Sequence, residues 1–253
     1  MLARLLLALL ALIVSQPAWA TGGATGFGST FGAGATDSVQ TGYTTGPAAQ
    51  TSVSVWLFIN GAAGTNRVFD QTGSSAHSNV QLQPASTTSL SYTAGFTTTD
   101  AIFTFPIGTV SRWHHVCLTY DNSSTSNKPT VYVDGAAATV TTSTTPVGTA
   151  VSSNAKPIFI GNRSAANRVF DGKLADFAYW NGVLLSANEC AGLASGSSPL
   201  KIRPASLSMY LPLMGIGGAQ PDWGPSHVTQ TVVGTVAQPG NPVSGYPLQE
   251  LGK

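Results

Sequence analysis

The stretch from Trp113 to Gly135 constrains the fold of this chain most. It contains two runs rich in β-branched and aromatic residues, 114–120 and 130–133, on either side of a polar loop. The second run ends at Asp134-Gly135, a dipeptide that accepts the two positive φ angles of a type I′ turn. We therefore expect a third strand over 136–142, and with it a three-stranded antiparallel meander with one long loop and one tight turn.

Short strand-like runs recur along the rest of the chain at intervals of about ten residues, separated by turn-forming residues. They cover 37–43, 51–59, 66–71, 79–83, 89–92, 102–105, 157–161, 173–180 and 207–213. In 51–59 (TSVSVWLFI) apolar residues occupy both faces toward the end, as in a central strand covered on each side. Together with the absence of helical periodicity, this spacing predicts an all-β sandwich or barrel.

One helix is expected after the last of the main strands. Residues 186–189, Ser-Ala-Asn-Glu, have the form of a capping box, in which Ser186 accepts from a free amide and Glu189 reaches back. The helix should end near Ala194, because Gly196 stands where a left-handed C′ residue belongs.

The two ends of the chain have their own compositions. Arg4, an apolar run over 5–14 and Ala18-x-Ala20 predict a signal peptide over 1–20, cleaved after Ala20, and thus a secreted or periplasmic protein. A membrane anchor is the weaker alternative, since about 20 apolar residues are needed to span a bilayer. We expect 21–36 to be a flexible Gly-rich leader, 37–213 the folded domain, and 214–253 a Gly/Pro-rich tail with a short strand near 228–236.

The charge and cysteine content of the chain exclude some functions and leave the state of its two cysteines open. Charged residues make up 8% of the chain and the formal net charge is +1. No basic stripe exists to neutralise phosphates, so nucleic-acid binding is not expected, and no segment after the first 20 residues predicts membrane insertion. In an oxidising compartment Cys117 and Cys190 either form a disulfide or are two separate buried hydrophobic residues.

Four segments, in this order and spacing, resemble a known family: WHHVCLTYD, TVYVDG, IFIGN and VFDGKLADFAYWNGVLLSANE. The resemblance is to the laminin-G-like (concanavalin A-like) jelly-roll family of bacteria and phages, and it is most specific over 109–195. It implies two antiparallel sheets packed face to face. Members bind carbohydrate or protein ligands, often with Ca²⁺, and distant relatives are glycoside hydrolases and polysaccharide lyases, so the fold alone does not select a function.

The residues needed for catalysis are scarce. A retaining glycosidase of this fold needs two carboxyl groups about 5 Å apart. The only glutamates are Glu189 and Glu250, and neither lies within three residues of an aspartate. For a lyase the candidates are the His114-His115 pair, Tyr120 and Tyr132, but no Arg or Lys cluster accompanies them, and determination of the fold is the favoured role for the histidines. An enzyme is therefore the least favoured class.

Calcium stays open as a cofactor. Asp37, Asp171 and Asp176 are the candidate ligands, because Ca²⁺ takes oxygen ligands including one or more carboxylates. Many relatives carry Asp-Asp where this chain has Ala175-Asp176, so one ligand is missing from that pattern.

For sugar binding, aromatic faces stack on pyranose rings while amides meet the hydroxyl groups. Trp180 and Asn181 at a strand end, Tyr92 with Phe96, and Asn122 in the long hairpin loop are the candidate ligand-binding residues. The alternative is that Trp56, Trp113 and Trp180 are core residues. The leading hypothesis is a secreted, non-catalytic module that binds a glycan or a cell-surface protein; the alternative is a structural or adhesion component of an envelope, fibre or virion.

Overall fold

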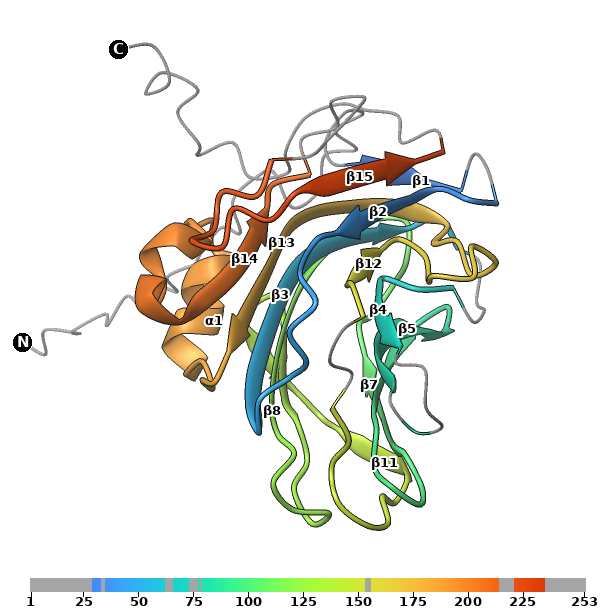
Figure 1. Cartoon of the computed structure of the whole chain (residues 1–253), viewed down its shortest axis with the longest axis vertical. Helices are drawn as coiled ribbons and strands as arrows, with labels where there is room; N and C mark the ends of the chain where they lie inside the picture. Colours follow the sequence, from blue (N-terminus) through green and yellow to red (C-terminus); the bar gives the residue numbers. More distant parts are fainter. Residues whose placement is uncertain are drawn as a thin grey trace, which may run out of the picture.

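The computed structural model describes residues 29–32, 35–61, 66–72, 77, 79–152, 156–213 and 221–234, which form two antiparallel sheets packed face to face (Figure 1). Sheet A has seven strands in the order β1 (Ser29–Phe31), β13 (Gly172–Asn181), β3 (Gln50–Ile59), β8 (Trp113–Asp121), β9 (Thr130–Val133) and β10 (Ala136–Ala138), with β14 (Leu207–Leu211) also paired to β13. Sheet B has eight strands in the order β11 (Thr141–Thr144), β7 (Ala101–Pro106), β6 (Ser89–Ala94), β5 (Asn79–Ser86), β4 (Phe69–Thr72), β12 (Phe159–Ile160), β2 (Ser38–Thr41) and β15 (Gln230–Val233). The predicted two-sheet sandwich is confirmed.

The core lies between the two sheets because alternate residues of each strand point to the same face. In β3, Val53, Val55, Leu57 and Ile59 face inward, and β3 lies between β13 and β8, the central position predicted for it. Edge-to-face aromatic pairs join the sheets: the rings of Phe69 and Phe177 lie 5.6 Å apart, and those of Tyr92 and Tyr120 lie 5.8 Å apart. Each such side chain contributes about 1.5–3 kcal/mol through burial alone.

The meander forms as predicted, with one difference. Asp134 and Gly135 have φ angles of +52° and +82°, as a type I′ turn requires, and β8, β9 and β10 pair in order. The third strand expected over 136–142 is wrong as a single element. It ends at Ala138, and β11 begins at Thr141 in the opposite sheet, because the chain crosses from sheet A to sheet B there.

One α-helix, α1 (Ala187–Ala194), lies on the outer side of sheet A (Figure 1). Both bonds of the predicted capping box are present: the Glu189 amide donates to Ser186 Oγ, and the Ser186 amide donates to Glu189 Oε2 at 2.7 Å. Gly196, at φ +94°, closes the C-terminus as predicted. A disulfide joins Cys190 in α1 to Cys117 in β8.

The structure corrects both ends of the expected domain. Within the leader predicted over 21–36 to be flexible, Ser29–Phe31 forms β1 and pairs with β13, because Phe31 buries its ring in the core, with an exposed fraction of 1%. The strand predicted near 228–236 is β15 (Gln230–Val233), which pairs with β2, so sheet B extends past the boundary expected at 213. The predicted signal peptide lies outside the described residues. Among the described helices, none has the length and apolarity to cross a membrane.

Candidate ligand-binding site

A pocket of about 340 Å³ opens at one end of the sandwich, the lower end in Figure 1, where β8 leads into its hairpin loop. We call it the end pocket. Four parts of the chain form it: the loop before β3, Phe96 two residues after the end of β6, the β8–β9 loop, and the connection from β11 to β12. Its lining consists of Pro47, Ala49, Phe96, Asn122, Ser123, Thr125, Gly148, Thr149, Ala150, Val151 and Ser152.

Backbone hydrogen bonds fix these segments to one another. The Asn122 amide donates to the Ala49 carbonyl at 2.8 Å, and the Val151 amide donates to the Gly95 carbonyl at 2.9 Å. Gly148 is required where it stands: its φ is +98°, and a Cβ there would lie 2.0 Å from Oγ1 of Thr97. The walls of the end pocket are therefore held in place before any ligand arrives.

Every side chain that lines the end pocket is uncharged. Asn122 supplies an amide, and hydroxyl groups come from Ser123, Thr125, Thr149 and Ser152. Pro, Ala and Val side chains supply the apolar part of the wall, while the ring of Phe96 is 1% exposed and closes the pocket from the core side. Such a surface can exchange hydrogen bonds with neutral hydroxyl groups and can pack against C–H groups, but it offers no ion pair.

Of the five predicted ligand-binding residues, the structure brings two to this pocket: Asn122, and Phe96, whose ring is buried in its floor. Tyr92 is 3% exposed and packs in the core, where burial raises the pKa of its hydroxyl. Trp180 is 0% exposed beneath α1, and its Nε1 donates to the Ile202 carbonyl at 2.8 Å. Neither ring can stack on a ligand from these positions, so the structure places Tyr92 and Trp180 in the interior and not at a binding surface.

Asn181 has a structural task at the end of β13. Its Oδ1 accepts from the Ala48 amide at 2.6 Å, and its Nδ2 donates to the Tyr43 hydroxyl and the Gly46 carbonyl at 3.2 and 3.1 Å. It thus holds the loop that ends at the pocket wall, without lining the pocket itself. Sequence reasoning missed the wall residues Pro47, Ala49 and 148–152, because small loop residues carry no pattern that marks a site.

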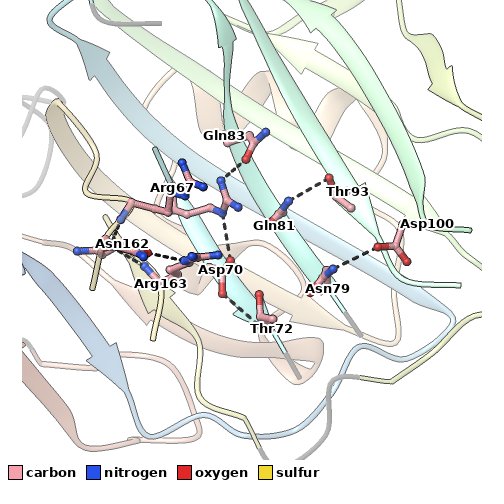
Figure 2. A network of polar contacts seen from close by, with 12 residues as sticks. Arg67, Asp70, Thr72, Asn79, Gln81, Gln83, Thr93, Asp100, Asn162 and Arg163 are labelled. Carbon is pink, nitrogen blue, oxygen red and sulfur yellow. Dashed lines mark hydrogen bonds and ion pairs between the residues drawn. The ribbon is translucent and has the colours of Figure 1, made fainter. Parts of the chain in front are cut away.

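Asp70, on the outer face of sheet B, belongs to a network of polar side chains (Figure 2). Asp70 in β4 is 1% exposed, and its Oδ2 accepts from Nε of Arg67 at 3.1 Å. Arg67 also donates to the side chain of Gln83 in β5. The neighbouring pairs are Gln81 with Thr93 and Asn79 with Asp100. The carboxylate of Asp70 is therefore engaged in holding strands β4 and β5 together.

The predicted calcium ligands do not form one site. Asp171 accepts from Nδ2 of Asn60 at 2.8 Å, Asp176 accepts from the Tyr210 hydroxyl at 2.7 Å, and Asp37 lies beside Gly234. Among the described residues no group of three or more His, Cys, Asp or Glu side chains is placed to hold a metal ion. The donor set therefore does not fit Ca²⁺, which takes six to eight oxygens.

The two adjacent histidines are both buried, on opposite faces of β8. Nδ1 of His114 lies 2.9 Å from Oδ2 of Asp134, and its Nε2 lies 2.8 Å from the Thr109 carbonyl. Burial raises the pKa of Asp134, but hydrogen bonds from His114 and from the His115 amide outweigh it and lower that pKa overall. His114 thus ties the tight turn of the meander to the start of β8, the fold-determining role favoured from the sequence.

Two antiparallel sheets packed face to face, with a loop-lined pocket at one end, define an antiparallel β-sandwich. Residues 33–189 match the family model of the concanavalin A-like lectin/glucanases superfamily, and the chain belongs to this family. No curated protein matches the chain.

Solved structures with the same fold are distant in sequence. A protein from Bacteroides ovatus, provisionally assigned to carbohydrate binding, is 18% identical with a TM-score of 0.55; the match covers 87% of this chain and 61% of that one. A heptameric SAP-like pentraxin from Limulus polyphemus is 14% identical with a TM-score of 0.54, covering 87% and 95%. Tailspike protein 2 of an Escherichia coli O157:H7 bacteriophage is 12% identical with a TM-score of 0.53, covering 74% and 26%. These likenesses show the fold.

Proposed function

We propose that this protein is an exported, non-catalytic carbohydrate-binding module that takes the end of a neutral glycan into the end pocket. The observation that carries the proposal is the lining of that pocket, which combines an amide and four hydroxyl groups with apolar side chains and has no charge. A sugar ring presents the same mixture, hydroxyl groups at its edge and C–H groups on its faces.

The size and charge of the end pocket narrow the ligand class. At about 340 Å³ it stands at the lower end of the range for small-molecule sites, which favours one end of a glycan over a long internal segment. A phosphate, sulfate or uronate group in the end pocket would find no positively charged side chain among the described lining residues, so we expect charged glycans to bind poorly.

The placement of the acids supports a role without catalysis. Among the described residues, no Asp or Glu lines the end pocket. The described acids have local partners, as in the pairs of Asp70 with Arg67, Asp134 with His114 and Glu189 with Arg203. Hydrolysis with retention needs two carboxyl groups facing one glycosidic bond, and the end pocket offers none.

A glycan array, followed by calorimetry on the sugars that bind, tests the proposal. Thr125 is exposed on the pocket rim, so Thr125→Trp should fill the pocket and abolish binding there. Asn122→Ala should weaken binding about fivefold, the value of one hydrogen bond. Lys128→Trp, in the same loop but outside the pocket, is the matched control and should bind like the wild type.

Two results would contradict the proposal. One is undiminished binding by Thr125→Trp. The other is that the wild type binds no neutral glycan on the array, which would favour the structural or adhesion role. Release of reducing ends from a bound oligosaccharide would instead show that the module is an enzyme.

A further inference from the structure

The outer face of sheet A is covered by α1 over only part of its area. The remaining part carries a row of aromatic side chains, Trp56 and Phe58 on β3 and Trp113 on β8, all partly exposed. Phe58 and Trp113 are register partners whose rings meet edge to face at 5.9 Å, and Nζ of Lys173 lies 5.4 Å from the Phe58 ring. One sequence interpretation placed Trp56 and Trp113 in the core. The structure instead places both side chains, partly exposed, on the outer face of sheet A. Partly exposed aromatic faces on a sheet are suited to stacking against a ligand.

A small notch lies where this aromatic row meets α1. Its volume is about 10 Å³, close to the space that one water molecule needs. Sheet A contributes Ser54, Trp56, His115 and Asp176, and the other wall consists of Leu193, Gly196, Ser197 and Pro199. The notch therefore admits one oxygen-sized group and nothing larger.

His115, which lines this notch, has one ring nitrogen without a hydrogen-bond partner among the described residues. His115 is 1% exposed; its Nε2 lies 2.8 Å from Oγ of Ser54, while its Nδ1 has no hydrogen-bond partner among the described residues. Burial lowers the pKa of His115 to about 4, against the opposing effect of Asp134, so the ring is neutral near pH 7. A neutral ring nitrogen can hydrogen-bond to a hydroxyl group or to water, and buried polar groups of this kind nearly always have such a partner.

The local backbone brings a second polar group to the same place. Asp176 has a φ of +49° within the β-bulge of β13, and a bulge re-aims the side chain that it carries. Its Oδ1 accepts from the Tyr210 hydroxyl at 2.7 Å, which fixes the carboxylate beside the notch. The ring of Trp56 packs against His115 with centroids 5.2 Å apart, so the aromatic row and the notch adjoin directly.

We propose that the aromatic row and the notch form a second sugar-binding subsite, in which a pyranose ring stacks on Trp56 and one of its hydroxyl groups enters the notch to hydrogen-bond with Nδ1 of His115. This inference rests on the proposed glycan-binding function and adds a subsite remote from the end pocket. A hydroxyl group suits the notch because it is the size of the water that it replaces and both donates and accepts. The ligand class is a neutral glycan with a free hydroxyl beside an apolar ring face.

Calorimetry with the glycans found on the array, at neutral pH, tests this subsite. Trp56→Ala should weaken binding about tenfold, the value of one aromatic contact at the upper end of its range. Ser197 is exposed at the rim, so Ser197→Leu should fill the notch and weaken binding similarly. Ser195→Leu, exposed two residues earlier and outside the notch, is the control and should bind like the wild type. Addition of glycan should also shift the Nδ1 resonance of His115 in the wild type.

The outcomes separate this inference from the proposed function. If Thr125→Trp abolishes binding while Trp56→Ala and Ser197→Leu bind like the wild type, the second subsite is refuted and the end pocket stands. If Trp56→Ala and Ser197→Leu weaken binding while Ser195→Leu does not, the subsite is supported, whatever Thr125→Trp does. If the wild type binds no neutral glycan, both proposals fail.

Discussion

Cys117 in β8 is bonded to Cys190 in α1, and the two cysteines lie 73 positions apart in the sequence. The bond attaches the only α-helix of the described chain to the outer face of sheet A, over a cluster that includes Trp180, Leu185 and Tyr210. Of the two arrangements that the sequence left open, a disulfide or two separate buried cysteines, the structure has the disulfide. Leu193 at the end of the helix and the segment that follows it, 196–199, form one wall of the notch beside His115.

We predict that removing this disulfide destabilises the fold strongly. A loop of 73 residues corresponds to about 4 kcal/mol of chain entropy in the unfolded state, and native disulfides typically contribute about 2–5 kcal/mol. Urea denaturation of the Cys117→Ala/Cys190→Ala double variant should show a loss in this range. The reduced wild type should match the variant; equal stability of the oxidised and reduced protein would contradict the prediction.

Loss of the capping box of α1 should lower the stability of the fold by less than loss of the disulfide. Ser186→Ala removes the side chain that accepts from the Glu189 amide and should cost about 1 kcal/mol. Glu189 is also bonded to Arg203 at 2.6 Å; this bond and those from Ser186, opposed by burial, lower the pKa of Glu189 to about 2. Because the Arg203–Glu189 pair is largely exposed, Glu189→Gln should cost less than about 1 kcal/mol. A larger loss for Glu189→Gln than for Ser186→Ala in thermal denaturation would contradict this order.

Burial of His115 predicts a loss of stability in mild acid. The unfolded chain takes up a proton on this residue below about pH 6.5, whereas the folded protein does so only below about pH 4. The free energy of unfolding should therefore fall with pH through this window, and His115 should account for about 2 kcal/mol between about pH 7.5 and about pH 5. NMR titration of the His115 ring checks the cause directly. A ring that becomes protonated with a midpoint of 6 or above would contradict it.

Ionic strength should have almost no effect on glycan binding. None of the described residues that line the end pocket is charged, so no ion pair is available there for salt to screen. Dissociation constants measured by calorimetry at about 50 mM and about 500 mM salt should agree within about a factor of two. A fall in affinity of tenfold or more would show that a charged group contacts the ligand, and the end pocket would then be the wrong site.

Much of the fold is predictable from local patterns because those patterns have local causes. The Asp134-Gly135 turn and the Ser186 cap depend on the chemistry of two to four neighbouring residues, and both form as expected. The break between Ala138 and Thr141 was missed because the change of sheet depends on the whole sandwich. The same holds for Ser29–Phe31, whose Gly-rich surroundings conceal a strand that exists because Phe31 fills a place in the core.

The candidate site was harder to predict, for two physical reasons. The sequence predicts that Trp180 stacks on a sugar and offers the core as one alternative for Trp56. In the structure Trp180 is buried under α1, while Trp56 is partly exposed. A strand alternates its faces, but the sequence does not say which stretch of an outer face a helix will cover. The end pocket joins loops that are far apart in sequence, 47–49 and 148–152, and only strand pairing brings them together.

The most direct test of the central claim is an NMR titration of the ¹⁵N-labelled protein with an oligosaccharide that binds on the array, with the mass of the sugar measured afterwards. The account predicts that amide shifts include the end-pocket segments 47–49, 122–125 and 148–152, and that the sugar is recovered intact. Binding that leaves all three segments unshifted, or a shortened oligosaccharide, would contradict it.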